Sequence, residues 1–171
     1  SDIQNRLTNS QSGEVRVGNG YDVHRFETGD HLMLCGVKIP FNKGLSGHSD
    51  ADVALHAITD AILGTAGAGD IGEYFPPEDP KWENSPSEVF LVEAHNIAKN
   101  NSLMLVNIDL TIVFEEPKIT PFKKAMIEYL SKVLQIDKKR INIKAKTSEG
   151  LGFVGRKEGI AAFAIVNAQK Y

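Results

Sequence analysis

Residues 47–70, GHSDADVALHAITDAILGTAGAGD, are the stretch of sequence on which the fold depends most. Apolar residues recur in this stretch with a period near 3.6, which predicts an amphipathic helix of about four turns. Ser49 followed by Asp52 has the spacing of a capping box and predicts that the helix begins at this point. Gly64 interrupts the pattern and is expected to end the helix. The periodic apolar positions are Val53, Ala54, Ala57, Ile58, Ala61 and Ile62.

Three titratable residues stand four positions apart in this helix. They are Asp52, His56 and Asp60, and this spacing puts their side chains along one helix face. A helix that only packed against a core would not need such a row. The alternative is a solvated acidic face that carries one incidental histidine, and this segment alone leaves both interpretations open.

The composition is that of a globular protein of one domain. The 171 residues are 42% hydrophobic and 24% charged. The net charge of -3 offers no basic surface, so nucleic-acid binding is not expected. Cys35, the one cysteine, lies in an apolar run and is expected to be a buried thiol in a reducing, cytoplasmic setting. No apolar run approaches the roughly 18 residues of a membrane helix and no secretory signal is visible, so no membrane partner is expected.

Hydrophobic patterns and turn residues divide the rest of the chain into strands and helices. Residues 1–13 are polar and aperiodic, which predicts a linker or flexible tail before one domain over residues 14–171. The domain is predicted to be an α+β fold in which helices cover one face of a mixed sheet. Residues 68–84 contain three prolines and are expected to be irregular. The predicted strands are 14–26, 31–35, 37–40, 105–114, 140–146 and 159–166, and the further helices are 85–99 and 120–135.

Two of these strands carry additional information. Gly18 and Gly20 in the first strand predict a close approach of another backbone segment, or a bulge. Strand 105–114 is expected to bury one face. The residues of that face are Val106, Ile108, Leu110, Ile112 and Phe114.

Asp22, His24 and His56 form a candidate metal site. Asp22 and His24 are two residues apart on a strand, so both side chains leave the same face. Three protein ligands with a fourth position open are typical of catalytic zinc. Asp60 or Asp52, one turn from His56, is predicted to orient its imidazole. The alternative is that Asp22 and His24 form only a turn-and-cap pair at the end of a strand.

Two loops form further candidate sites. Thr147, Ser148 and Glu149 enter a loop with four glycines, where hydroxyl and backbone N–H groups suit phosphate and Glu149 suits a hard cation such as magnesium. The alternative is an ordinary glycine-rich turn. Residues 115–120, EEPKIT, are either the edge of a pocket shaped by Pro117 and Lys118 or a simple connection from strand to helix.

Three separated segments resemble the 2-C-methyl-D-erythritol 2,4-cyclodiphosphate synthases of the non-mevalonate isoprenoid pathway. They are residues 18–26, 47–82 and 144–162, and the resemblance extends over residues 15 to about 168. It implies a lyase that closes a cyclic diphosphate from CDP-methylerythritol phosphate and expels CMP. It also implies a homotrimer with active sites between subunits, a zinc ion, and a magnesium or manganese ion that binds with the substrate near Glu149.

The resemblance also implies individual roles. Asp22, His24 and His56 match the zinc ligands, and His48 and Thr147 match the catalytic positions. Phe153 and Arg156 match residues of the trimer's central channel, where some members hold an isoprenoid diphosphate. The other positions that match substrate contacts, together with Asp22, His24, His48 and Thr147, are Ser49, Asp70, Ile71, Gly72, Phe75, Asp79, Phe114, Pro117, Lys118, Ile119, Thr120, Lys146, Ser148 and Glu149.

The sequence departs from the family pattern at a few points. Ala51 stands where glycine is common, and Lys146 stands where threonine is common, which removes a hydroxyl but keeps a group able to contact phosphate. Residues 1–13 resemble the connector of fused enzymes in which a cytidylyltransferase domain precedes this one. Two other functions stay open at this stage: a zinc-dependent phosphate-ester hydrolase that uses the same three ligands, and a non-catalytic trimer that binds isoprenoid diphosphates.

Overall fold

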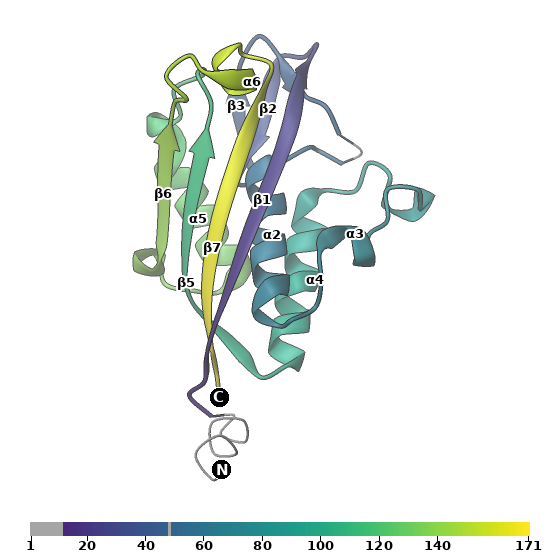
Figure 1. Cartoon of the computed structure of the whole chain (residues 1–171), viewed down its shortest axis with the longest axis vertical. Helices are drawn as coiled ribbons and strands as arrows, with labels where there is room; N and C mark the ends of the chain where they lie inside the picture. The colour runs from purple at the N-terminus through teal and green to yellow at the C-terminus, as the bar shows by residue number, and fades with distance from the viewer. Residues whose placement is uncertain (1–11, 48) are drawn as a thin grey trace.

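The computed structural model describes residues 12–47 and 49–171, and its main element is a mixed five-stranded sheet (Figure 1). The order of its strands is β4-β1-β7-β5-β6. Strands β5 and β6 run parallel, whereas β1 pairs with β4 and β7, and β7 with β5, in antiparallel fashion. The strands are β1 (Val15–Glu27), β4 (Gly44–Leu45), β5 (Leu103–Val113), β6 (Ile141–Lys146) and β7 (Gly159–Lys170), while β2 (His31–Leu34) and β3 (Val37–Pro40) form a separate hairpin.

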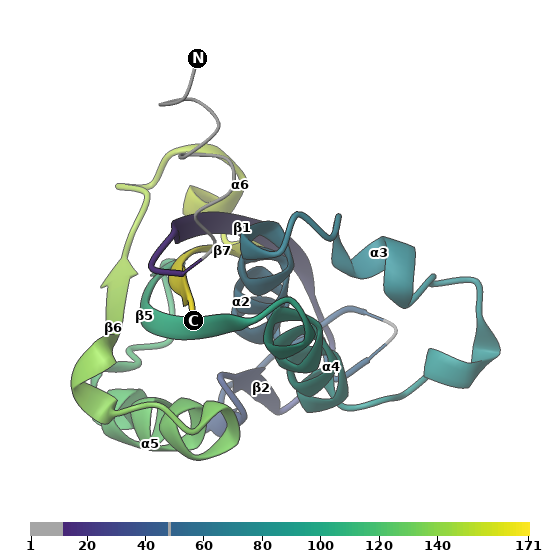
Figure 2. The same ribbon diagram turned by 90° about the horizontal axis from the view of Figure 1, so that it is seen from below.

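The long helices lie on one face of this sheet, as the view along its strands shows (Figure 2). They are α2 (Val53–Thr65), α4 (Ser87–Asn100) and α5 (Lys123–Leu134). The predicted α+β fold with a mixed sheet and helices on one face is therefore confirmed. Within the described residues, no helix has the length and apolar character needed to cross a membrane. The remaining elements are short: α3 (Ile71–Tyr74), α6 (Gly152–Gly155), η1 (Pro80–Trp82), η2 (Thr120–Phe122) and η3 (Lys138–Arg140).

Gly18 and Gly20 let helix α2 lie directly on strand β1. A Cβ atom at Gly18 would stand 1.8 Å from the carbonyl oxygen of Ala61, and one at Gly20 would stand 1.8 Å from that of Ala57. The predicted close approach of two backbones is therefore confirmed, and its partner is the helix. Because side chains alternate along a strand, the next positions on the same face are Asp22 and His24. The glycines thus bring the helix within reach of these two side chains.

The opposite face of the sheet is apolar, and none of the three long helices covers it in the described chain (Figure 2). The rings of Tyr21 and Phe163 lie side by side there, with centroids 4.8 Å apart. Contiguous apolar surface of this kind usually marks an interface. The exposed hydrophobic residues of β1 and β7 are Val15, Val17, Tyr21, Val23, Phe163 and Ile165.

The start of helix α2 differs from the prediction. The N-cap is Asp52, whose Oδ1 accepts a hydrogen bond of 3.0 Å from the Leu55 N–H, so the predicted start at Ser49 is wrong. The same carboxylate also accepts from the N–H groups of Cys35 and Gly36 and is fully buried. Burial raises its pKa to about 6, although the three N–H groups favour the charged form. Asp52 therefore fastens the β2–β3 hairpin to the helix, and Cys35 is buried as predicted.

Four further features differ from the predicted ones. Residues 68–84 are not wholly irregular, because Asp70 and Asp79 cap the short elements α3 and η1. A register shift between Leu105 and Asn107 changes which residues of β5 face the core, so that Leu105 rather than Val106 is buried. Helix α4 begins after Pro86, which makes no side-chain cap. The predicted helix 120–135 is divided into η2 and α5.

Candidate metal centre and active site

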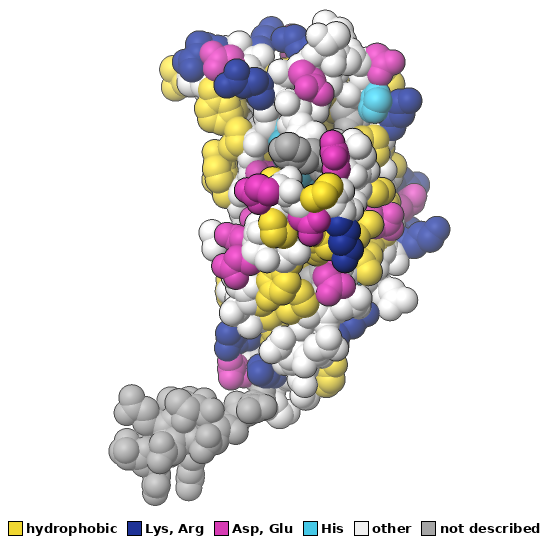
Figure 3. Space-filling model, turned by 90° about the vertical axis from the view of Figure 1, so that its right-hand side faces the viewer, with side chains coloured by type: hydrophobic (Ala, Val, Ile, Leu, Met, Phe, Trp, Pro, Cys, Tyr) yellow, Lys and Arg dark blue, Asp and Glu magenta, His cyan; other side chains and the backbone are white. Residues whose placement is uncertain are grey.

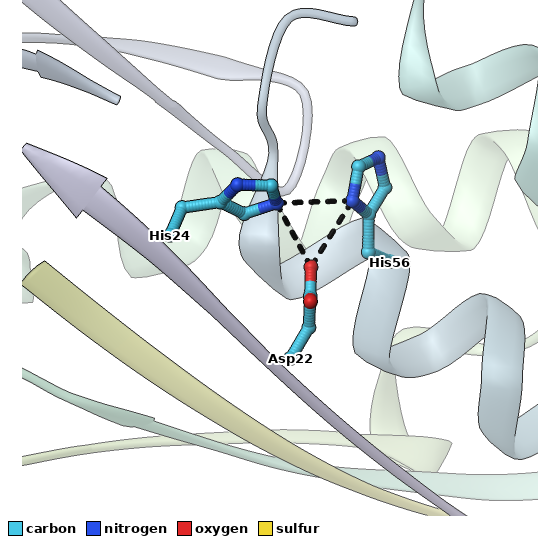
Figure 4. Close-up of side chains that lie close together, drawn as sticks. All are labelled: Asp22, His24 and His56. Atoms are coloured by element: carbon cyan, nitrogen blue, oxygen red, sulfur yellow. Dashed lines mark hydrogen bonds and ion pairs between the residues drawn. The ribbon is translucent and has the colours of Figure 1, made fainter. Parts of the chain in front are cut away.

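Strand β1 and helix α2 bring Asp22, His24 and His56 together (Figure 4). Asp22 Oδ2 lies 2.9 Å from His24 Nε2 and 3.1 Å from His56 Nδ1. The two ring nitrogens are 3.2 Å apart. One oxygen and two nitrogens therefore converge on one point, as expected for ligands of a single cation and not for a turn-and-cap pair. The predicted association of the three residues is confirmed.

The hydrogen bonds of the two imidazoles fix which nitrogen faces this point. His24 Nδ1 lies 2.8 Å from the carbonyl oxygen of Ser46, which can only accept, so Nδ1 carries the proton and Nε2 presents its lone pair. His56 turns Nδ1 toward Asp22, and its Nε2 lies 2.9 Å from Ser87 Oγ and 3.3 Å from Ser49 Oγ. Each ring therefore turns one nitrogen toward the cluster.

Neither of the two carboxylates predicted to orient His56 does so. Asp52 is committed to the backbone N–H groups that it caps, and Asp60 Oδ1 accepts a hydrogen bond of 2.8 Å from the Ile71 N–H. The nearest side-chain partner of His56 Nε2 is instead Ser87 Oγ, at 2.9 Å. The prediction was wrong because helical spacing alone does not reveal that each carboxylate has a competing backbone partner.

The cluster has the charge that a cation site requires. Burial favours a higher pKa for Asp22, but hydrogen bonds and charges from His24 and His56 outweigh it and lower the pKa to about 2. Burial lowers the pKa of His24, yet the hydrogen bond to Asp22 and the bond to Ser46 leave it raised overall. Asp22 is consequently a carboxylate at neutral pH, and its negative charge suits a cation.

A cavity of about 210 Å³ opens beside His24 and His56. Ser49, Ile71, Gly72 and Phe75 are part of its lining, so four predicted substrate contacts lie next to the candidate metal ligands. Its far wall is aromatic: Phe75 contacts Phe90 and Trp82, with ring centroids 4.6 and 4.8 Å away. Figure 3 shows this side of the molecule, where acidic and hydrophobic side chains lie close together.

Asp70 and Asp79 have structural partners near this cavity. Asp70 caps α3 by accepting from the Glu73 N–H, and Asp79 Oδ1 accepts a hydrogen bond of 2.9 Å from the Lys81 N–H. Neither residue lines the cavity. Asp60 on α2 holds the first N–H of α3, which keeps the Ile71–Gly72 backbone at the cavity edge. The predicted roles of Asp70 and Asp79 in substrate binding stay predictions.

The other predicted substrate segments meet at a second place, beyond the carboxyl ends of the parallel strands β5 and β6. The Phe114 N–H donates to the carbonyl oxygen of Lys146 at 2.9 Å. Glu115 Oε1 accepts from Ser148 N and Ser148 Oγ, both at 3.1 Å, and from Gly150 N at 3.3 Å. Residues 114–120 and 146–149 thus form one loop cluster, as parallel strand ends predict. These bonds lower the pKa of Glu115.

The two clusters are separate within one chain. Strand β7 stands between β1 and β5, and β6 lies beyond β5, so strand spacing alone puts the loop cluster about 10 Å from the candidate metal ligands on its β5 side and about 14 Å on its β6 side. Phe153 and Arg156 lie in and just after α6, where the Arg156 Nε donates to Glu158 Oε1 at 2.6 Å. They are not part of either cluster. His48 and the predicted linker up to residue 11 lie outside the described residues.

Sequence reasoning missed the polar residues behind His56. Ser87 Oγ donates to Asp50 Oδ1, and the Ser87 N–H lies 3.3 Å from Asp50 Oδ2. Ser87 looked like an ordinary first-turn residue of a helix. No pattern links it to a histidine 31 positions earlier, so only the packing of α4 on α2 could reveal it.

The fold is α+β, and two histidines and a carboxylate from a strand and a helix meet beside a cavity. These features define a class of protein with a candidate catalytic metal centre. The YgbB family model matches residues 15–169. The chain therefore belongs to the YgbB family of 2-C-methyl-D-erythritol 2,4-cyclodiphosphate synthases. The resemblance predicted from three segments is thereby confirmed.

Individual relatives agree with this assignment. The bifunctional enzyme IspD/IspF of Bartonella henselae is 59% identical over 154 residues, which cover 90% of this chain and 39% of the relative. The bifunctional IspDF from Campylobacter jejuni has a TM-score of 0.90 at 45% identity, covering 94% of this chain and 43% of that one. A 2C-methyl-D-erythritol-2,4-cyclodiphosphate synthase in a CDP-bound form has a TM-score of 0.83 at 41% identity, covering 90% and 100%. The chain spans about two fifths of the length of the curated relatives that it matches.

Proposed function

We propose that this chain converts 4-diphosphocytidyl-2-C-methyl-D-erythritol 2-phosphate into 2-C-methyl-D-erythritol 2,4-cyclodiphosphate and CMP. A bond forms between the substrate's 2-phosphate oxygen and the β-phosphorus of its CDP group, while the bond from that phosphorus to the CMP oxygen breaks. The observation that carries the proposal is the convergence of Asp22, His24 and His56 in a chain of this family. The alternative of a zinc-dependent hydrolase is not favoured.

The three donors suit a divalent cation, zinc in the first place. Zinc is bound by imidazole nitrogen and carboxylate oxygen, and three protein ligands leave a position for a substrate oxygen. Each imidazole turns one nitrogen toward the cluster, and that nitrogen would bind a metal once it carries no proton. When bound there, such a cation would supply positive charge next to the crowded phosphate oxygens.

The chain's own residues would bind and orient the substrate. The 2-phosphate is already anionic, so the reaction needs no strong general base. The requirement is to hold both ends of the substrate together, which contributes about 7–11 kcal/mol in well-aligned cases. Ser49 and the Ile71–Gly72 backbone would hold the methylerythritol phosphate, and residues 114–120 and 146–149 the CDP group. His48 and Thr147 are proposed to stabilise the transition state, and Glu149 to hold magnesium or manganese.

A homotrimer with shared active sites is part of this proposal. It is supported by the separation of the two residue clusters, because a neighbouring subunit would bring the loop cluster of one chain to the metal ligands of another. It is also supported by the uncovered apolar face of β1 and β7. Phe153 and Arg156 would then lie along a central channel able to hold an isoprenoid diphosphate. A cytoplasmic location and a fused cytidylyltransferase domain also stay proposals, the latter supported by the bifunctional relatives.

Product analysis is the direct test of the reaction. We expect the purified chain to convert the substrate into equal amounts of CMP and a cyclic diphosphate, which ³¹P NMR distinguishes by its two coupled phosphorus signals. An acyclic phosphate product would contradict cyclisation and favour the hydrolase. Release of no product, with retained affinity for isoprenoid diphosphates, would instead favour the non-catalytic trimer.

The trimer can be tested by placing charge on the uncovered sheet face. We expect Val17→Asp combined with Ile165→Asp to convert the trimer into monomers in sedimentation velocity, because two carboxylates would be buried without partners. Activity is expected to be lost as the trimer dissociates, since each site needs two subunits. Val92→Asp, an equally apolar exposed position on α4, is the matched control and should leave the trimer intact. Unchanged sedimentation of the double variant would contradict this interface.

A further inference from the structure

A chain of hydrogen bonds extends from His56 Nε2, the ring nitrogen that faces away from the metal cluster, through Ser87 to Asp50. Ser87 Oγ lies 2.9 Å from His56 Nε2, and its hydroxyl donates to Asp50 Oδ1. Asp50 Oδ2 also lies 3.3 Å from the Ser87 N–H, so one carboxylate holds the serine at two points. Ser87 is fully buried, although it stands in the first turn of a helix. A buried hydroxyl at such a position is typically retained for its hydrogen bonds.

The direction of these hydrogen bonds follows from the chemistry of the ligand. A cation at the cluster needs the lone pair of His56 Nδ1, so the ring proton must be on Nε2. The Nε2–H then donates to Ser87 Oγ, which leaves the serine proton for Asp50, an acceptor only. If Ser87 donated to Nε2 instead, the proton would lie on Nδ1 and close the metal position. The Ser87–Asp50 hydrogen bond therefore favours the tautomer of His56 that can bind a metal, whereas the Asp22 carboxylate, 3.1 Å from Nδ1, favours the other one in the absence of a metal.

We propose that Ser87 and Asp50 are a positioning pair that fixes the tautomer and ring orientation of the metal ligand His56. The inference rests on the metal centre of the proposed function and assigns it two residues outside the predicted site. Neither residue would touch the metal or the substrate. Residues with this role typically change metal affinity by about 10–100-fold. Ser49, whose Oγ lies 3.3 Å from Nε2 and 3.4 Å from Ser87 Oγ, is a weaker second partner.

The first test is zinc affinity, measured by competition with a chelating dye in the full chain. We expect Ser87→Ala and Asp50→Ala each to weaken zinc binding by about 10–100-fold. Because the two residues act in series, the zinc affinity of the double variant should be at most about threefold lower than that of the single variant with the lower affinity. Ser85→Ala, two residues away and outside these hydrogen bonds, is the control and should match the wild type. Fully additive losses in the double variant would overturn the pair.

The second test reads the tautomer itself and does not depend on affinity. In the metal-free protein the Asp22 carboxylate, 3.1 Å from His56 Nδ1, competes for the ring proton. We therefore expect ¹⁵N NMR to show a larger share of His56 with its proton on Nε2 in the wild type than in Ser87→Ala. A general loss of folding would change many signals at once, whereas loss of the pair changes those of His56. If the wild type bound no zinc, the proposed metal centre would be wrong. If the wild type and Ser87→Ala bound zinc equally and shared one tautomer, the positioning pair alone would be wrong.

Discussion

The variant His56→Ala is expected to lose bound metal and to turn over substrate about 10³-fold more slowly than the wild type. His56 supplies one of only two nitrogens in the cluster, and its removal leaves Asp22 and His24, both from β1, without a ligand from the helix. Two ligands on one strand do not surround a cation. Loss of a metal that stabilises developing phosphate charge costs several kcal/mol in the transition state, which corresponds to about a thousandfold in rate.

Metal content and kinetics should change together in this variant. Emission spectrometry of protein prepared with zinc should give close to one equivalent per wild-type chain and close to none for His56→Ala. His31→Ala is the matched control, because His31 is an exposed histidine that lies away from the cluster. Its Nδ1 pairs with Asp30 Oδ1 at 2.7 Å. It should retain both metal and activity. Full activity of a metal-free His56→Ala protein would refute the metal centre, and a folded far-UV spectrum would exclude loss of structure as the cause.

The parts of the fold that repeat a pattern could be predicted from the sequence. The apolar period of α2 and the alternation along β1 and β7 depend only on which residues face the core, so they are visible in one chain without its partners. The same applies to Asp22 and His24, since two residues on one strand face share a side. His56 could be proposed as the third ligand from its residue type, whereas Gly18 and Gly20 predicted a close backbone approach, or a bulge, without indicating that the helix is the partner. These predictions depend on local geometry, and the structure confirms them.

What could not be predicted depends on competition between partners. The position of Asp52 is compatible both with a row of charges on the helix face and with a helix cap. The hydrogen bonds from the Cys35 and Gly36 N–H groups hold its carboxylate in the capping position. The bulge near Leu105 moves one face of β5 by a residue without any signal in the apolar pattern. Ser87 meets His56 only because α4 packs on α2. In each case the deciding atom comes from a distant segment, which a pattern in the sequence does not contain.

The variant Gly20→Ala is expected to lose both stability and metal affinity, because Gly20 sets the distance between the two elements that carry the ligands. A Cβ atom there would stand 1.8 Å from the Ala57 carbonyl oxygen and 2.7 Å from its carbon. Both are backbone atoms of α2, so no side-chain rotation relieves the contact and the helix must move outward. Overpacking of this severity destabilises by about 3 kcal/mol, the upper end of the usual range.

Zinc affinity is a second, independent measure of the outward movement of α2. Ala57 follows His56 directly, whereas Asp22 and His24 follow Gly20 on the strand, so a helix that moves away from Gly20 carries one ligand away from the other two. A misplacement of about 1 Å can reduce a rate by about 10²-fold, and zinc affinity should fall with it. The free energy of unfolding should be measured in the presence of EDTA at fixed protein concentration, so that metal binding does not contribute to it.

Gly44→Ala is the matched control for this experiment. Gly44 lies in the same sheet, and its Cβ atom would meet nothing nearer than 3.6 Å, an ordinary van der Waals contact. It should change the free energy of unfolding by less than about 1 kcal/mol and leave zinc affinity unchanged. If Gly20→Ala matched the wild type in stability and in zinc affinity, the close approach of α2 to β1 at Gly20 would not be required. The convergence of Asp22, His24 and His56 would then require another cause than the glycines beneath α2.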